Sequence, residues 1–433
     1  MVEEKSLACS TLSTFLAELH EHIYKYFDSI LNTLVPLLNS ITFDDLRLCA
    51  LSVMESALIT VENNIYKNVC TSDQYIQLFN RLLTELLNCL SGEEELEILM
   101  PTAQTLKIIL ERSVLKDSQT NAVLHVLTES DFERIISSIK IALYNSMQRR
   151  DHLSNGEEDV EEEEEEEHLQ SENNENAFQV YLSECIGVLL KLYQTKFFTV
   201  FDRLFMDEVL KFTDELKSIG DKQFGLFIID DIIEYCGASA YPYYPQFLTI
   251  FLREIQYPDP NVRQSIAYGI GITAKYGGEV FESMADTYIC ALRDMLSSPE
   301  SESPEYLLAV DNAISSLGKI CYYHPNLSSY KMLFNFWLNC LPLHGDLEES
   351  DFCMNYLCEL LEKNDINSYL SSISQILKVL CFSLELVKQE TLHRIIRLIS
   401  VIQTKVPSEI MNDLWAFVGN EKANLIRMAM MAQ

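Results

Sequence analysis

Glycine and proline are scarce in this sequence, with 13 and 11 copies in 433 residues. Nucleotide-binding α/β folds and β-sandwiches use more turn glycines than that, and the alternating pattern and hairpin turns of strands are also missing. Hydrophobic residues nevertheless make up 48% of the chain, which is enough for a continuous core. Long apolar stripes with few helix breakers therefore predict an all-α protein.

Basic residues are also in short supply. The chain has 32 Lys and Arg against 65 Asp and Glu, so its formal net charge at pH 7 is −33. Direct binding to nucleic acid or to anionic membranes is disfavoured, because phosphates need cationic partners. The charge favours a basic protein partner, although a merely soluble acidic protein is equally consistent with it.

Paired cysteines and long apolar runs are absent as well. Twelve cysteines are scattered singly, none of them in a CxxC motif, and most fall at apolar helical positions. We expect them to be small buried thiols in a reducing compartment. The N-terminus Met-Val-Glu-Glu-Lys lacks the pattern of a signal peptide, and no stretch of about 18 apolar residues could span a membrane. These features predict a cytoplasmic or nucleocytoplasmic protein.

What the sequence does contain is a succession of helix-length segments with 3.6-residue apolar periodicity. Helix pairs that recur every ~40–47 residues are typical of HEAT and armadillo arrays, in which neighbouring pairs stack into a superhelix. We therefore predict a HEAT-repeat α-solenoid of antiparallel helix pairs, with repeats over 1–150 that continue over 177–433 as one array. The expected helices span 11–38, 43–63, 73–90, 93–113, 130–148, 177–195, 199–217, 221–236, 243–256, 260–276, 279–297, 304–323, 328–341, 347–363, 366–381, 384–403, 407–418 and 420–431.

A local pattern supports the repeat assignment. Asp259 precedes Pro260 at the start of an expected helix, where it can cap the helix N-terminus, and Arg263 follows in the first turn. A second copy of the pattern contains Asp45 and Arg47. Asp-x-x-Val-Arg is typical of second helices in HEAT repeats. We therefore interpret these four residues as a structural ladder between repeats and not as a ligand site.

Residues 151–176 interrupt the helical pattern. Residues 157–175 hold twelve acidic residues and no Lys or Arg, and without these twelve the formal net charge of −33 would still be −21. Such a block repels itself and has little to bury, so we expect a disordered acidic loop. It either attracts a basic partner or serves as a solubilising linker. Its centre is the unbroken run Glu161, Glu162, Glu163, Glu164, Glu165, Glu166 and Glu167.

Motifs of catalysis, cofactor binding and metal binding are missing. A loose dinucleotide fingerprint at Gly269, Gly271 and Ala274 lies inside an expected helix, where small residues allow close packing instead. There is no phosphate loop, nucleophile elbow or zinc motif, and the eight histidines are dispersed. We therefore predict a protein that is not an enzyme, with no catalytic residues, no cofactor and no metal.

Polar residues on second helices are the candidates for a binding surface. In solenoids of this kind the second helices line the concave face, which is the usual binding face. Clustered carboxylates there would attract a cationic chain, although ordinary solvated helix surface is the alternative for each of them. The candidate inner-face residues are Asp230, Asp231, Glu234, Asp311, Asn312 and Asn355.

Four blocks of sequence resemble a known family. Residues 222–236, 262–278, 311–320 and 337–346 are similar, in this order, to the C-terminal half of karyopherins of the importin beta-3 class, in the importin-beta superfamily. The glutamate-rich segment lies where that family carries an acidic insertion. The resemblance extends over about 157–365 and is weak after residue 366.

The resemblance implies a nuclear import receptor. Such receptors bind basic localisation segments on an acidic concave face, with ribosomal proteins and histones among their cargo. They release cargo when the GTPase Ran binds with GTP, and they contact Phe-Gly nucleoporins through apolar crevices. A receptor of this kind occurs in the cytoplasm and the nucleus, and at the nuclear pore in transit.

Family members are more than twice as long, and the N-terminal repeats that make their main Ran contact have no counterpart here. Ran binding therefore stays open, and so does whether the chain is a truncated form.

A second hypothesis assumes the same fold but a different function. A HEAT scaffold or regulatory subunit of another complex, such as that of a phosphatase or kinase, needs no basic partner. An enzyme would require a clustered polar pocket, and the sequence shows none.

Overall fold

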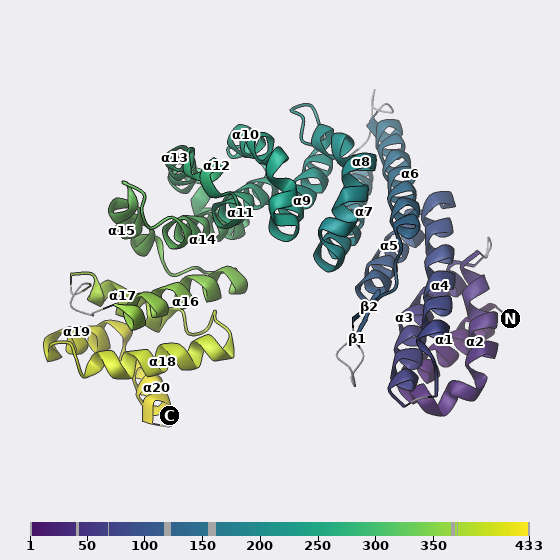
Figure 1. The fold of residues 1–433 in the computed structure, drawn as a ribbon, viewed down its shortest axis with the longest axis horizontal. Coiled ribbons are helices and arrows are strands. Elements are labelled where there is room, and N and C mark those ends of the chain that lie inside the picture. Colours follow the sequence, from purple (N-terminus) through teal and green to yellow (C-terminus); the bar gives the residue numbers. More distant parts are fainter. Residues whose placement is uncertain are drawn as a thin grey trace. The chain divides into compact units, whose positions relative to one another are not determined.

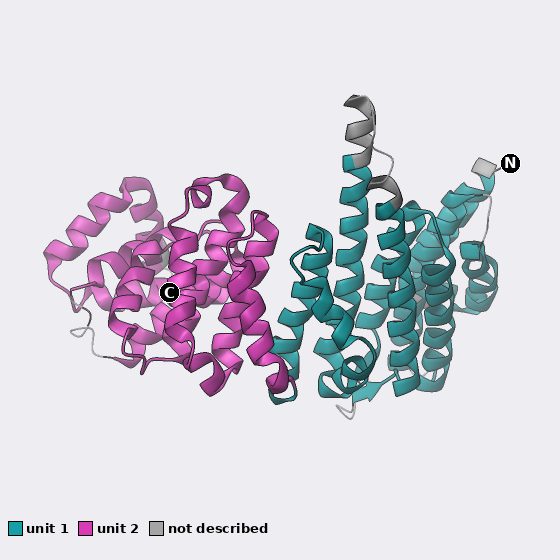
Figure 2. Ribbon diagram, turned by 90° about the horizontal axis from the view of Figure 1, so that it is seen from above, with its two compact units in different colours: residues 1–239 teal, residues 240–433 magenta. Residues whose placement is uncertain are grey.

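The computed structural model describes residues 2–39, 43–67, 69–116, 123–154, 162–364, 369 and 371–431, which are mostly α-helical (Figure 1). They form two compact units, residues 1–239 and 240–433 (Figure 2). Each unit is a stack of helix pairs in two layers, here called the first-helix layer and the second-helix layer. The predicted HEAT-repeat solenoid fold is confirmed.

In the first unit, successive helices of each layer pack side by side. In the second-helix layer, α1 packs on α3, α3 on α5, α5 on α7 and α7 on α9, and in the first-helix layer α4 packs on α6 and α6 on α8. The second-helix layer consists of α1 (Val2–Leu19), α3 (Asp44–Tyr66), α5 (Leu96–Glu111), α7 (Glu162–Tyr193) and α9 (Ile219–Cys236). The first-helix layer consists of α2 (Phe27–Leu34), α4 (Ser72–Gly92), α6 (Glu129–Ser154) and α8 (Thr195–Phe212), with 3₁₀ turns η1 (His20–Tyr26) and η2 (Val35–Asn39) beside α2.

The second unit follows the same scheme after the turn η3 (Gly237–Tyr243). Its second-helix layer consists of α11 (Pro260–Tyr276), α14 (Leu307–Tyr323), α16 (Leu347–Lys363), α18 (Gln389–Gln403) and α20 (Asn420–Met431), each packed on the next. Its first-helix layer consists of α10 (Tyr244–Glu254), α12 (Gly278–Glu282), α13 (Ala285–Leu296), α15 (Tyr330–Cys340), α17 (Ile373–Phe382) and α19 (Ser408–Val418). The short turns η4 (Pro299–Glu302) and η5 (Pro304–Tyr306) precede α14.

A row of buried aromatic rings joins the two layers of the first unit. Phe197, Phe201 and Phe205 are four residues apart along α8, so they form one stripe. Phe132 of α6 contacts one end of this stripe at a centroid distance of 5.3 Å, and Phe224 of α9 contacts the other end at 6.2 Å. All five rings are almost completely buried. This spacing fixes the register between α6, α8 and α9.

Helix ends follow the sequence closely where a cap is present. The Asp259 carboxylate accepts hydrogen bonds from the backbone N–H groups of Asn261 (2.9 Å) and Val262 (3.0 Å), and Pro260 occupies the first turn of α11. This confirms the cap predicted from the sequence. Thr71 and Gln74 form a capping box at the start of α4.

Two expectations about local structure are wrong. The helix expected over 11–38 is broken by η1, which separates α1 from α2. A short antiparallel hairpin is present where no strand is expected, formed by β1 (Val114–Lys116) and β2 (Val123–His125). Strands of three residues are too short to show a two-residue period, which explains why the sequence pattern does not reveal them.

The loop expected over 151–176 is also shorter than predicted. α6 continues to Ser154 and α7 begins at Glu162, so residues 155–161 lie between the described helices. Glu175 is buried against α6, where it accepts hydrogen bonds from Ser146 Oγ (2.7 Å) and from Arg149 Nε (2.5 Å). Because Glu175 belongs to this buried ion pair, the second half of the acidic segment starts a packed helix.

Candidate functional site

Three carboxylates gather on the second-helix layer of the first unit. Asp231 and Glu234 are three residues apart on α9, so they share one face of the helix, and Glu184 of α7 lies near enough to affect the ionisation of Asp231. All three side chains are half-buried. We call Glu184, Asp231 and Glu234 the acidic cluster.

Asp231 is the most constrained member of the acidic cluster. Its carboxylate lies against the backbone of α7, where a Cβ added at Gly187 would be 2.3 Å from Oδ2. Burial, together with the charge of Glu234 and against the opposing charge of Lys191, raises the pKa of Asp231 to about 7. Near neutral pH, this carboxyl is therefore poised between its neutral and its ionised form.

Basic residues offset part of this charge. Lys107 of α5 pairs with Glu184 at 3.1 Å, and Arg112 pairs with Glu55 (3.0 Å) and Glu62 (3.3 Å) of α3. These pairs are partly exposed, so each contributes little to stability and can exchange partners with an incoming cation. The surface over α3, α5, α7 and α9 thus suits a ligand that brings its own positive charges.

Two of the predicted inner-face residues do not lie on a surface. Asp230 is buried, since the residue before Asp231 is turned by about 100° around the helix axis. Asp311 is fully buried in α14, and its carboxylate accepts hydrogen bonds from the backbone N–H groups of His344 (3.0 Å), Gly345 (2.6 Å) and Asp346 (3.0 Å). Asp311 therefore holds the turn before α16, and it cannot meet a ligand without unfolding that turn.

Two predicted asparagines connect neighbouring helices. Asn312 is buried, and its Nδ2 donates to Asp346 Oδ2 at 3.0 Å. Asn355 is half-buried; it donates to Thr391 Oγ1 (2.8 Å) and accepts from Arg394 (2.7 Å) of α18. Asn312 is therefore not an inner-face residue, and the amide of Asn355 links α16 to α18.

Of the predicted ladder residues, the two arginines contact the next repeat. Arg263 is buried, donates to the carbonyl of Tyr257 (2.6 Å) and reaches Glu300 of the next repeat at 3.9 Å. Arg47 is also buried, and it pairs with Asp44 and with Glu93, which lies between α4 and α5 of the next helix pair.

Asp45 takes a different position from the one expected of a ladder residue. It is exposed in the first turn of α3, and among the described contacts Arg47 pairs with Asp44 instead. Of the predicted acidic loop, Glu161 lies outside the described residues, and the side chains of Glu162, Glu163, Glu164, Glu165, Glu166 and Glu167 are not described.

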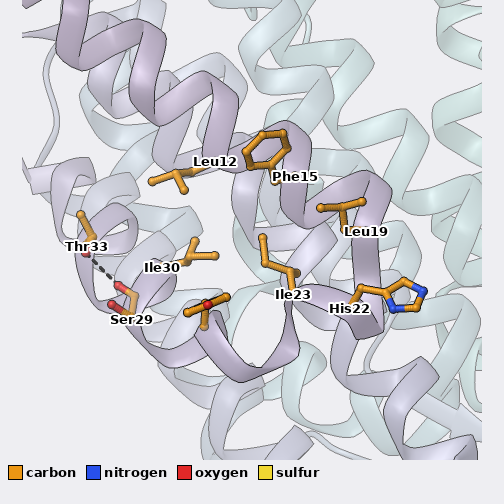
Figure 3. A pocket seen from close by; sticks show the side chains of 9 residues that line it. Leu12, Phe15, Leu19, His22, Ile23, Ser29, Ile30 and Thr33 are labelled. Atoms are coloured by element: carbon orange, nitrogen blue, oxygen red, sulfur yellow. Dashed lines mark hydrogen bonds between the residues drawn. The ribbon is translucent and has the colours of Figure 1, made fainter.

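An apolar groove lies at the break between α1 and α2. It has a volume of about 460 Å³ and is open on one side, because η1 turns α2 back toward α1 (Figure 3). Phe15 and Leu19 of α1 line it and are 46% and 43% exposed. On the opposite wall, Ile23 and Ile30 are buried. A groove of this chemistry suits an apolar or aromatic side chain from another molecule.

Several interior residues carry charge that the sequence does not mark. Lys319 of α14 is buried and pairs with Glu349 of α16 at 2.8 Å, and Glu349 also accepts from Ser315. Arg150 pairs with Asp221 at 2.5 Å across α6 and α9. No motif reveals these pairs, because each depends on which helices become neighbours.

Two further tests concern metals and membranes. Within the described part of the chain, no group of three His, Cys, Asp or Glu side chains is placed to hold a metal ion. None of the described helices combines the length and the apolar character that crossing a bilayer requires.

Comparison with known proteins identifies relatives of one kind. The importin repeat 6 family matches residues 121–214, which include α6, α7 and α8. Importin subunit beta-3 of Saccharomyces cerevisiae is 27% identical over 142 residues, which are 33% of this chain and 13% of that protein. A probable importin-5 homolog of Dictyostelium discoideum is 25% identical over 178 residues, 40% of this chain and 16% of that protein.

Solved structures agree on the fold. The crystal structure of Kap121p bound to Nup53p superimposes with a TM-score of 0.73 over 95% of this chain and 36% of that chain, at 16% identity. Kap121p bound to RanGTP gives a TM-score of 0.68 at 17% identity, over 95% of this chain and 37% of that chain. This chain thus spans little more than a third of the length of these structures. The importin repeat and the importin relatives make this chain similar to karyopherins of the importin-beta superfamily, and the solved structures show that it shares their solenoid fold.

Proposed function

We propose that this chain acts as a nuclear transport receptor, or as part of one, that binds basic cargo proteins and carries them through the nuclear pore. Ribosomal proteins and histones have the required charge. The receptor occurs in the cytoplasm and in the nucleus, and at the nuclear envelope in transit. Binding and transport of this kind need no catalytic residue and no cofactor, so we propose no enzymatic activity for the chain.

The observation that carries the proposal is the importin repeat match over 121–214. This segment contains the acidic stretch 157–175 and also Glu184 of the acidic cluster. Importins form the matched family, and the acidic charge supplies the chemistry that a basic cargo needs. A Lys- or Arg-rich segment can place its cations beside Glu184, Asp231 and Glu234 and displace the weak pair between Lys107 and Glu184.

Reversing charge in the acidic cluster should weaken this binding. We expect a Glu184→Lys and Glu234→Lys double variant to bind a Lys/Arg-rich localisation peptide about tenfold more weakly than the unmodified chain at low salt, which corresponds to about 1.4 kcal/mol. Both side chains are half-buried at the surface, so the fold should survive. Fluorescence anisotropy titrations at two salt concentrations measure the effect. Glu409→Lys, an exposed carboxylate on α19, is the matched control.

The pH profile of the same titration provides a sharper control. The pKa of Asp231 is about 7, so its carboxyl ionises as the pH rises from 6 to 8, and a cationic peptide should bind about threefold more tightly at pH 8. Folding stability should move the other way, because a raised carboxyl pKa favours the folded state as pH falls. Asp231→Asn should abolish the rise in affinity. An unchanged rise in this variant, or equal binding by the double variant and the unmodified chain, would refute the cargo surface.

The apolar groove suits the second partner of such receptors, the Phe-Gly nucleoporins. A Phe ring entering between Phe15 and Ile30 would cover apolar surface that is now open to water. We expect Phe15→Asp to weaken binding of a Phe-Gly repeat peptide about tenfold, and Leu7→Asp, on the same helix outside the groove, to leave it unchanged. Isothermal titration calorimetry with the Phe-Gly peptide measures both. Equal affinity for the two variants would show that the groove is not the contact.

Ran is the third partner to test. Kap121p has been crystallised with RanGTP, and this chain covers 37% of that protein. Pull-down with RanGTP, a basic peptide and a phosphatase catalytic subunit separates the two functions that the fold allows. Capture of the phosphatase subunit without the basic peptide or RanGTP would favour a HEAT scaffold of another complex.

A further inference from the structure

The last part of the second unit departs from the acidic character of the chain. Residues 370–433 hold seven Lys and Arg against five Asp and Glu, whereas the whole chain has 32 against 65. This segment contributes α17 to α20. A basic surface here would attract ligands that the rest of the molecule repels.

Two exposed aromatic rings meet where α17 and α19 end. Phe382 is the last residue of α17 and Phe417 lies in the last turn of α19. Their ring centroids are 5.9 Å apart, in an edge-to-face arrangement. The side chains are 40% and 58% exposed. Two large apolar side chains that contact each other and still face solvent form a ready surface for a third apolar group.

A lysine lies over each ring. Lys378 Nζ of α17 is 4.1 Å from the centroid of Phe417, and Lys422 Nζ of α20 is 5.1 Å from that of Phe382. Lys422 also pairs with Glu385 at 3.2 Å, but the Glu385 side chain is 86% exposed, so this pair is weak. Among the described residues, no carboxylate forms an ion pair with Lys378. We call Lys378, Phe382, Phe417 and Lys422 the cation–aromatic edge.

We propose that the cation–aromatic edge binds an acidic peptide segment in which an aromatic or large apolar residue is flanked by Asp or Glu. The apolar side chain would pack on the Phe382 and Phe417 rings. One carboxylate would pair with Lys378, and a second would replace Glu385 at Lys422. Both contacts strengthen on binding, because the peptide covers the rings and removes water from the ammonium groups.

Other occupants fit this edge less well. Anionic membranes attract clusters of four to eight Lys or Arg, and this edge has two lysines. A basic cargo segment would be repelled by both ammonium groups. Two copies of a chain that carries −33 repel one another over their whole surfaces, which disfavours self-association. The ligand chemistry is thus opposite in sign to that of the proposed cargo, and this inference does not depend on the proposed function.

The test uses the full chain and a fluorescent peptide with two Phe residues among Asp and Glu. We expect saturable binding that weakens as salt rises. Lys378→Glu should weaken it about tenfold, and Phe417→Ser to a similar extent. Lys405→Glu is the matched control, because Lys405 is an exposed lysine near the opposite end of α19. All variants should still bind the basic localisation peptide unchanged, which separates this edge from the acidic cluster.

Several outcomes would overturn the proposal. Equal binding of the acidic peptide by Lys378→Glu and the unmodified chain is one of them. Equal binding of a peptide with Asn and Gln in place of Asp and Glu would show that the cation–aromatic edge does not recognise the negative charge of the peptide. Capture of the chain by vesicles of anionic lipid, lost in Lys378→Glu, would assign the edge to a membrane surface. A concentration-dependent increase in mass by light scattering, also lost in Lys378→Glu, would assign it to a second copy.

Discussion

An Asp311→Ala variant should unfold at markedly lower denaturant concentration than the unmodified protein, with a loss of about 3–5 kcal/mol in the free energy of unfolding of the second unit. The Asp311 carboxylate is fully buried and accepts from three successive backbone N–H groups, those of His344, Gly345 and Asp346. Alanine leaves these three donors without the charged acceptor that Asp311 supplies from the core. Urea unfolding followed by circular dichroism measures the loss.

Asp311→Asn provides the matched control for this prediction. The amide keeps one acceptor oxygen but loses the charge, so its cost should be roughly half that of Asp311→Ala. Binding of the basic localisation peptide to folded Asp311→Ala should stay unchanged, because this carboxylate does not reach the surface. Unfolding indistinguishable from that of the unmodified protein would mean that the 344–346 turn does not depend on Asp311.

The buried pair between Lys319 and Glu349 should show a comparable effect with a different signature. Glu349→Ala leaves the Lys319 ammonium buried without its carboxylate, and removing one partner of such a pair typically costs about 3–5 kcal/mol. Ser315 loses an acceptor in the same variant. Thermal and urea unfolding should both show the second unit destabilised.

A double variant distinguishes the charge from the packing. Lys319 lies over the rings of Tyr268 (4.8 Å) and Phe352 (5.8 Å), so a methionine at this position has apolar neighbours. We expect Lys319→Met with Glu349→Leu to recover most of the stability that Glu349→Ala loses, since both charges then leave the interior together. A double variant as unstable as Glu349→Ala would show that the pair itself, and not an uncompensated charge, sustains this interface.

Local signals in the sequence are sufficient to predict most of the helices. Asp259 and Pro260 mark the start of α11 because a cap and a first-turn proline act within one turn. The break at η1 and the hairpin of β1 and β2 leave no such mark, because a seven-residue turn and two three-residue strands are too short to show a repeating apolar pattern. The packing of α7 on α6 includes the ion pair between Glu175 and Arg149, which cannot be read from the acidic composition of the segment.

The candidate site is harder to predict than the fold, since a single step along a helix moves a side chain from the surface to the core. Asp230 and Asp231 are adjacent and chemically identical, yet Asp230 is buried and Asp231 belongs to the half-buried acidic cluster. Asp311 is likewise buried, because its carboxylate accepts hydrogen bonds from three backbone N–H groups in the turn at residues 344–346. Glu184 joins the cluster only through the packing of α7 on α9.

Hydrogen–deuterium exchange of the chain with and without a Lys/Arg-rich localisation peptide, at low salt, tests the central claim most directly. If α7 and α9 bind basic cargo through Glu184, Asp231 and Glu234, then slower exchange should concentrate in those two helices and disappear as salt rises. No protection at low salt, or protection confined to the first-helix layer at α4, α6 and α8, would contradict an acidic second-helix surface as the receptor's cargo site.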